Sequence, residues 1–174
     1  MTADHSGRGG NRKHAGIRRR AGKRTEAPRY LQLRADTLMG MFRYLPAPAR
    51  ARALAALARS TAEAGGDSAR RYAAAGAKDA AALLAKIEKT AAELGWGEWR
   101  FGKRTAARLA LEVRDSPFAA GYGAADTEVC APIAGMLQAV AGMVLGAPCE
   151  ARETGCCARG AKRCRFVAIL GKQP

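Results

Sequence analysis

The sequence predicts an α+β domain with a helical first part and two later β-hairpins. Apolar residues recur at spacings of three and four over 30–94, which is the period of helices buried along one face. The period changes to two over 97–113, and a second hairpin pattern over 149–170 follows an apolar run at 131–147. With 174 residues, 48% of them apolar, the chain can bury one sizeable core but is too short for two full domains.

Residues 1–29 are predicted to be a disordered basic arm. They contain nine Lys or Arg against two acidic residues, a net charge of +7, with five glycines and no apolar periodicity. Such a cluster can attract an anionic partner, either nucleic acid or lipid headgroups, because bound cations release counterions from phosphates; a solvated tail is the simpler interpretation. The predicted organisation is therefore an arm at 1–29 and one folded domain at 30–174.

Four helices are expected in the helical part. The first should occupy 30–45, and the second should begin beside Pro48 and end at Gly65-Gly66, since glycine is typical of a helix C-terminus. A short helix over 67–75 and a longer one over about 78–94 should follow. The apolar residues expected on the buried faces include Leu38, Met41, Phe42, Leu45, Leu54, Leu57, Leu83, Leu84, Ile87 and Leu94.

The first hairpin should turn at 102–105 and place alternate residues on one inward face. Residues 115–128 are predicted to form a loop, either a lid over a pocket or a plain packed loop. The run 131–147 is a buried helix or an undersized membrane span, because seventeen residues fall short of the ~20 that a bilayer needs. Its smooth face, with Gly135, lets a neighbouring backbone come close; its bulky, Met-rich face can line a cavity or pack as ordinary core.

Five cysteines lie between residues 130 and 164, and their context favours thiols or metal ligands over disulfides. No secretory signal is visible in the sequence, so a reducing, cytoplasmic compartment is expected. An odd number of cysteines also cannot all pair within one chain.

Reflection about the turn of the second hairpin sets Cys156 opposite Cys164, close enough for two thiolates to share one tetrahedral ion. Cys130, at the start of the apolar helix, can supply a third ligand. Glu153 can be the fourth if a bulge turns its side chain inward. Alternatives remain open: Cys149 or Cys157 in place of Glu153, a redox pair, or buried thiols without an ion.

The C-terminal residues resemble the 4-vinyl reductase domain, a small-molecule-binding family. That family has a Glu-x-x-Cys, a following Gly and a Cys-x-Phe, which correspond here to Glu153, Cys156, Gly160, Cys164 and Phe166. The similarity extends from about residue 30 to 170 and leaves the basic arm outside.

This resemblance implies an α/β (α+β) ligand-binding fold, with helices packed on a twisted antiparallel sheet, like the 4-vinyl reductase domain and TRAPP-subunit folds, and usually a homodimer. It also implies a structural zinc cofactor held by Cys130, Glu153, Cys156 and Cys164. Bacterial relatives bind hydrocarbons or serve bacteriochlorophyll synthesis. The implied partner is therefore an apolar small molecule: a lipid, hydrocarbon, aromatic compound or tetrapyrrole.

Two departures from the family limit this transfer. Phenol-sensing relatives hold their ligand with a pocket His and Trp, whereas the only histidines here, His5 and His14, lie in the arm, so neither phenol sensing nor a His-ligated haem is expected. Catalysis finds little support, because the folded part shows no dinucleotide fingerprint and no nucleophile with a His partner.

The leading hypothesis is a dimeric module that binds a hydrophobic ligand, with a structural zinc site, acting as a sensor or carrier. One alternative is a tetrapyrrole carrier or reductase of bacteriochlorophyll synthesis. Another is a nucleic-acid-binding regulator that uses the basic arm. The pocket residues expected from periodicity are Trp96, Trp99, Phe101, Phe118, Tyr122, Met136, Val140 and Met143.

Overall fold

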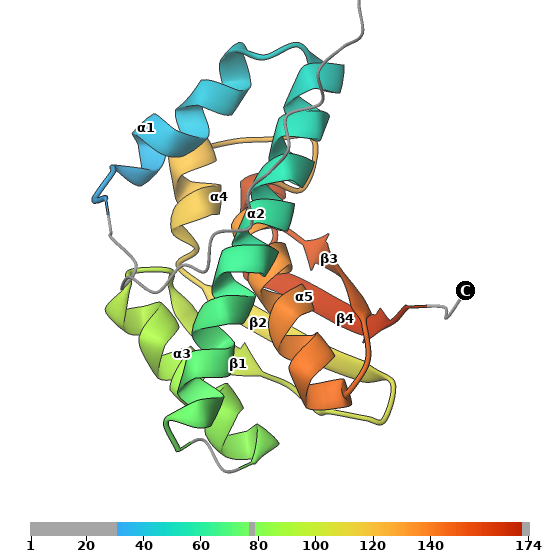
Figure 1. Cartoon of the computed structure of the whole chain (residues 1–174). Coiled ribbons are helices and arrows are strands. Elements are labelled where there is room, and N and C mark those ends of the chain that lie inside the picture. The colour runs from blue at the N-terminus through green and yellow to red at the C-terminus, as the bar shows by residue number, and fades with distance from the viewer. Residues whose placement is uncertain (1–30, 77–78, 172–174) are drawn as a thin grey trace, which may run out of the picture. The chain divides into compact units, whose positions relative to one another are not determined.

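Four antiparallel strands form one sheet with the order β1-β2-β4-β3 (Figure 1). The computed structural model describes residues 31–76 and 79–171, so the predicted basic arm lies outside the described residues and its role stays a prediction. The two predicted hairpins are confirmed, and pairing of β2 with β4 joins them. The strands are β1 (Glu98–Phe101), β2 (Arg108–Arg114), β3 (Cys149–Gly155) and β4 (Cys164–Leu170).

Helices cover the inner face of this sheet in two layers. Helix α5 (Ala131–Leu145) lies on β3 and β4, and the long helix α2 (Ala47–Ala74) packs on α5 from the other side (Figure 1). Helix α3 (Ala80–Glu93) packs beside β1. The fold is thus α+β, with helices on an antiparallel sheet, as predicted. The buried inward side chains of the sheet include Trp99, Leu109, Leu111, Val113, Cys164, Phe166 and Ala168.

Helix α2 corrects the prediction that Gly65-Gly66 ends a helix. It runs unbroken for 28 residues, and both glycines lie buried in its interior, so the predicted short helix 67–75 is its last part. A Cβ on Gly65 would stand 2.6 Å from Met136 Cε, and one on Gly66 would stand 3.4 Å from Ala139 Cβ. The glycines therefore serve close packing against α5, and tertiary contact outweighs their low helix propensity.

The smooth face of α5 lets α2 approach closely, as its small residues predicted. A Cβ on Gly135 would lie 2.0 Å from the carbonyl oxygen of Ala58, so no larger residue fits at this crossing. The opposite, bulky face of α5 buries Ile133, Leu137 and Val140 completely. Across 31–76 and 79–171, no helix combines the length and apolarity needed to cross a membrane.

A second group of short helices packs together beside this stack. It consists of α1 (Ala35–Gly40), the 3-10 helix η1 (Met41–Tyr44) and α4 (Pro117–Tyr122). Helix α4 corrects the prediction of an irregular loop at 115–128: Ser116 accepts a hydrogen bond from the Ala119 N–H at 3.4 Å, and Pro117 occupies the first helical position. Both are helix-start signals that sequence reasoning missed.

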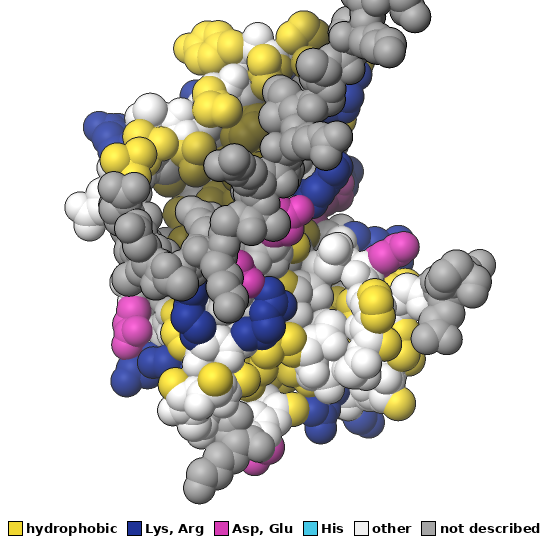
Figure 2. Space-filling view, viewed as in Figure 1, with side chains coloured by type: hydrophobic (Ala, Val, Ile, Leu, Met, Phe, Trp, Pro, Cys, Tyr) yellow, Lys and Arg dark blue, Asp and Glu magenta, His cyan; other side chains and the backbone are white. Residues whose placement is uncertain are grey.

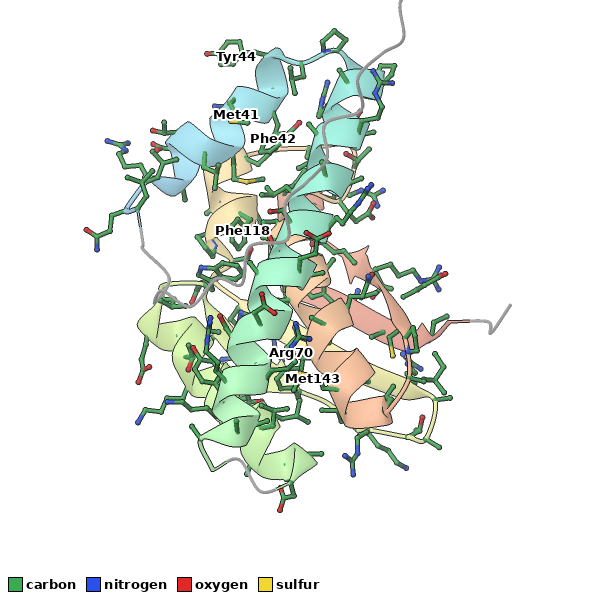
Figure 3. All side chains as sticks on the ribbon, viewed as in Figure 1. Met41, Phe42, Tyr44, Arg70, Phe118 and Met143 are labelled. Carbon is green, nitrogen blue, oxygen red and sulfur yellow. The ribbon has the colours of Figure 1, made fainter. Side chains whose placement is uncertain are left out.

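Two residues expected on buried faces are instead exposed. The change from α1 to η1 leaves Met41 52% exposed and buries Met39 in its place, and Leu94, beyond the last turn of α3, is 50% exposed. Figure 2 shows hydrophobic side chains gathered at the end of the domain formed by η1 and the start of α2, where Tyr44 is 88% exposed (Figure 3).

Candidate functional site

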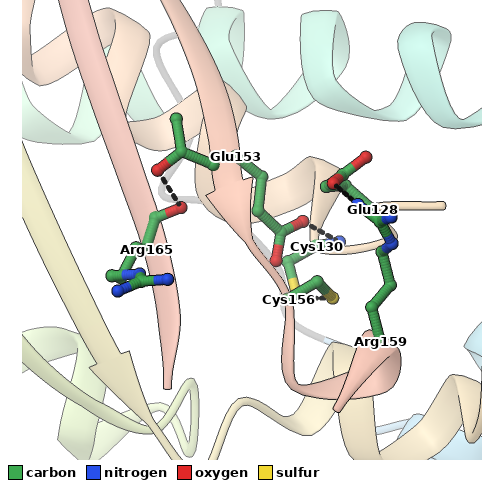
Figure 4. Close-up of polar contacts among 7 residues, drawn as sticks. Glu128, Cys130, Glu153, Cys156, Arg159 and Arg165 are labelled. Carbon is green, nitrogen blue, oxygen red and sulfur yellow. Dashed lines mark hydrogen bonds and ion pairs between the residues drawn. The ribbon is translucent and has the colours of Figure 1, made fainter. Parts of the chain in front are cut away.

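Four side chains from separate segments meet inside the domain (Figure 4). Cys130 immediately precedes α5, Glu153 comes from β3, Cys156 follows β3, and Cys164 begins β4. One ligand atom from each residue lies within 4.8 Å of all the others, and the three cysteines are buried. The structure thus brings together the four residues predicted as metal ligands. That they bind a metal stays a prediction.

The local backbone of the second hairpin explains how β3 presents Glu153. The register pairs Glu153 with Phe166 but Gly155 with Arg165, so a bulge lies between Glu153 and Gly155. An ideal strand would turn side chains three residues apart to opposite faces, and the bulge cancels that alternation. The predicted bulge is confirmed, and it lets Glu153 and Cys156 face the same point.

The spacing of the sulfur atoms fits a tetrahedral cation. Cys130 Sγ lies 3.9 Å from Cys156 Sγ and 3.7 Å from Cys164 Sγ. Zn–S bonds of about 2.3 Å at tetrahedral angles separate two sulfurs by ~3.8 Å. Disulfides would need S–S bonds near ~2 Å, and all three cysteines are free thiols. Three thiolates and one carboxylate form a donor set suited to zinc.

Hydrogen bonds around the cluster leave one buried oxygen without a partner. The Cys157 N–H donates to Cys164 Sγ at 3.3 Å, and the Cys130 N–H donates to Glu153 Oε2 at 2.9 Å. Glu153 Oε1 is buried and, among the described residues, has no hydrogen-bond partner. A buried carboxylate oxygen without a donor is costly, so its environment favours a cation at that position.

The pKa directions in the cluster describe a site with excess potential negative charge. Burial, followed by the neighbouring Cys156 side chain, raises the pKa of Glu153 to about 8. Hydrogen bonding from Cys130 and then Cys164 lowers the pKa of Cys156, while the same contact with Cys156 raises the pKa of Cys130. One thiolate is therefore stabilised at the expense of its neighbours, and a cation would allow all of them to ionise.

The two other cysteines lie outside this cluster. Cys149, at the far end of β3, donates its thiol hydrogen bond to the carbonyl of Ala147 at 3.4 Å, and burial raises its pKa. Cys157 is next to Cys156 in sequence but contributes its backbone N–H. Neither side chain joins the group of potential ligands, so this arrangement favours Glu153 as the fourth member.

Sequence reasoning missed Ser116 beside the cluster. Its Oγ lies 3.3 Å from Cys130 Sγ, and the residue is only 3% exposed. The same hydroxyl caps α4, so it ties that helix to the first ligand of the candidate site. A Ser-Pro pair is a recognisable helix start, but its closeness to Cys130 arises only in the folded chain.

Most of the predicted pocket aromatics form a chain of ring contacts. The Trp96 and Phe118 rings meet edge-on with centroids 5.0 Å apart, and Trp99 lies 6.4 Å from Trp96 and 6.2 Å from Phe101 (Figure 3). Val140 is fully buried, whereas Met136 and Met143 are partly buried against the core. Tyr122 has different company, because its hydroxyl accepts a hydrogen bond from Arg50 at 2.9 Å. That these residues line a ligand pocket stays a prediction.

Comparison with known proteins identifies the sheet and its ligand-bearing segments. Residues 109–170, from β2 through β4, match the family model of the 4-vinyl reductase domain. These residues form a 4-vinyl reductase domain. The match confirms the resemblance found in the sequence, and it contains all four residues of the candidate metal site. A comparison with curated proteins found no match.

Two solved structures share the fold of this 4-vinyl reductase domain protein. The phenol-responsive sensory domain of the transcription activator PoxR, solved with phenol, superposes with a TM-score of 0.68 at 17% identity, covering 82% of this chain and 77% of that chain. A vinyl-4-reductase family protein from Methanocaldococcus jannaschii superposes with a TM-score of 0.51 at 12% identity, covering 84% of this chain and all (100%) of that one. At such identities the likeness shows the fold.

Proposed function

We propose that this 4-vinyl reductase domain protein is a small-molecule-binding module, a sensor or carrier for an apolar ligand, whose sheet and α5 are joined by a structural zinc ion. The observation that carries the proposal is the convergence of Cys130, Glu153, Cys156 and Cys164 within the segment that matches the family. The fold shared with a phenol-responsive sensory domain supports the binding role, since that neighbour is a small-molecule sensor.

The zinc ion would act structurally. Four protein ligands complete a tetrahedral shell, and an open coordination position is what a catalytic zinc site needs. Cys156 and Cys164 would hold the ends of the second hairpin together, while Cys130 would anchor the start of α5 to it. The Cys157 N–H and the neighbouring Ser116 hydroxyl would stabilise the thiolates by hydrogen bonding.

Metal analysis of the purified full chain tests the zinc assignment. We expect about one zinc per chain by elemental mass spectrometry after expression with zinc supplied. Cys164→Ser should lose most of this metal, and Cys149→Ser, a matched control at a buried cysteine outside the cluster, should retain it. Absence of metal from the wild-type chain even after reconstitution, or equal loss in both variants, would contradict the assignment.

The ligand would lie against the chain of aromatic rings that joins Trp96, Trp99, Phe101 and Phe118. These rings offer apolar surface beside the bulky side of α5, and polarisable methionines such as Met136 adapt to ligands of different shape. Because both tryptophans of the chain belong to this group, a ligand bound there should change the intrinsic fluorescence.

Titration of the zinc-loaded full chain with a fatty acid, a polycyclic hydrocarbon and a porphyrin tests the binding role. We expect saturable changes in tryptophan fluorescence with at least one probe. Phe101→Leu, which shortens the end of the ring chain, should weaken binding, and Leu94→Ala, at an exposed apolar position, should not. If none of the probes binds and extraction of the purified protein yields no apolar compound, the module does not bind such ligands, whatever its zinc content.

The tetrapyrrole role is the second candidate, supported by the fold shared with a vinyl-4-reductase family protein. Preferential binding of the porphyrin would favour a carrier for that pigment class. Conversion of a vinyl to an ethyl group by the purified chain with a nicotinamide cofactor would instead identify a reductase. Homodimer formation, also proposed, can be measured by light scattering on the same sample.

A further inference from the structure

A surface cavity lies where η1, the start of α2 and the end of α4 meet. Its volume is about 530 Å³. No lining residue belongs to the metal cluster, and of the predicted apolar pocket only Tyr122 takes part. The lining residues are Arg43, Arg50, Tyr122, Ala124, Ala125 and Asp126.

Arg50 is the central polar group of this cavity. Its Nη1 donates to the Tyr122 hydroxyl oxygen at 2.9 Å, and its Nη2 donates to the Leu45 carbonyl at 3.4 Å. Its Nε is buried and, within the described part of the chain, has no hydrogen-bond partner. Guanidinium is always charged in proteins, so a partly buried one with an unused donor has a strong requirement for a negatively charged acceptor.

The surrounding charges leave that requirement unmet. Among residues 31–76 and 79–171, no carboxylate forms an ion pair with Arg50 or Arg43. Asp126 is the one acid in the lining, facing two guanidiniums. Arg43 is held over glycine backbone, since a Cβ on Gly40 would lie 3.3 Å from its Nη2 and one on Gly123 would lie 3.8 Å from its Nη1.

Tyr122 adds a hydroxyl donor and an apolar wall. Its oxygen accepts from Arg50, and no acceptor for its own proton is found among the described residues, so this proton can be donated to a ligand. The phenol ring together with Ala124 and Ala125 gives the cavity an apolar side. A ligand that satisfies both sides has an acidic head and an apolar body.

We propose that this cavity binds a small organic carboxylate, for which benzoate is a simple example. The carboxylate would accept hydrogen bonds from Arg50 and the Tyr122 hydroxyl, with Arg43 at the rim, and the apolar body would lie on Ala124 and Ala125. Charge-assisted bonds to guanidinium are among the strongest in proteins. Asp126 disfavours a doubly charged phosphate. This site does not depend on the proposed zinc or apolar-ligand function.

Titration of the full chain with benzoate, acetate and inorganic phosphate, followed by two-dimensional amide NMR, tests the site. The method locates binding, which matters because the chain has a net charge of +15 and attracts anions nonspecifically. We expect saturable shifts at Tyr122, Ala124 and Ala125, with benzoate bound more tightly than phosphate. Tighter binding of phosphate there, or shifts confined to other parts of the chain, would overturn the proposal.

Variants assign the interaction to individual groups. Arg50→Gln should weaken benzoate binding about tenfold or more, because charge-assisted bonds are lost. Arg52→Gln, an exposed residue on the same helix, removes an equal charge and should change the affinity by less than about twofold. Equal losses in the two variants would reduce the effect to net charge and overturn the site. If Arg50→Gln does not fold, Tyr122→Phe supplies the test, with about threefold or greater weakening expected and unchanged affinity contradicting the proposal.

Discussion

The packed centre around α5 and the open end around η1 and α4 each contain one buried polar atom without a partner among the described residues. In the centre this atom is Glu153 Oε1, an acceptor among thiols; at the open end it is Arg50 Nε, a donor of a charged group. The two regions therefore require ligands of opposite charge, a cation in one and an anion in the other.

The regions also differ in enclosure. The centre confines its four potential ligands within 4.8 Å of one another between sheet and helix, whereas the open end surrounds a surface cavity of about 530 Å³. An enclosed, complete ligand set suits an ion that stays bound during the life of the protein, and an open cavity suits a ligand that exchanges. The predictions below test this contrast, from the largest expected effect to the smallest.

Cys164→Ser should have the largest effect, because it removes one of the thiolates that would join the hairpin to α5. With zinc supplied, we expect the free energy of unfolding to fall by about 5 kcal/mol or more, a part of the ~10 kcal/mol by which structural zinc binds. Urea denaturation of the zinc-loaded chain measures it, with Cys149→Ser as control. A loss that persists unchanged when both proteins are stripped of metal would show that packing alone explains it.

Gly135→Ala tests the close packing of the centre without touching the cluster. Its Cβ would lie 2.0 Å from the Ala58 carbonyl oxygen, which is backbone and cannot rotate away, so we expect a loss of about 3 kcal/mol in urea denaturation. Gly66→Ala is the matched control in the same interface, because its Cβ would meet Ala139 at an ordinary 3.4 Å and alanine favours helix. Similar stability of the two variants would mean that α2 and α5 separate easily.

Ser116→Ala tests the link between the two regions, since this buried hydroxyl caps α4 and lies 3.3 Å from Cys130 Sγ. We expect a loss of about 1.5 kcal/mol, from the lost cap and the weakened hydrogen bonding at the sulfur. Ser68→Ala, an exposed serine of α2, serves as the reference in the same thermal unfolding series. An equal, small change in both would mean that the hydroxyl does not support the centre.

Tyr122→Phe should have the smallest effect on stability. Without ligand, Arg50 loses the oxygen to which its Nη1 donates, at a cost of about 1 kcal/mol. Added benzoate should stabilise the wild-type chain more than the variant, because a ligand stabilises the state that binds it. The same rise in melting temperature for both proteins would place benzoate elsewhere.

Local pattern in the sequence was enough to predict both hairpins, helix 131–147 and the bulge at Glu153. These depend on periodicity and turn residues close together in the chain, and the cysteine spacing depends on the register of one hairpin. The same local logic erred at Gly65-Gly66, where contact with α5 outweighs propensity, and at 115–128, where the Ser116-Pro117 signal was present but not used.

The sequence by itself therefore determined the class of the fold, its 4-vinyl reductase segment and the residues able to bind a metal. Only the tertiary structure decided that Cys149 and Cys157 stay outside the cluster, that Ser116 touches Cys130, and that Arg50 meets Tyr122 across 72 positions of sequence. The physical reason is that periodicity reports which face of an element is buried, whereas a site depends on which buried faces meet, and that is set by packing between distant segments.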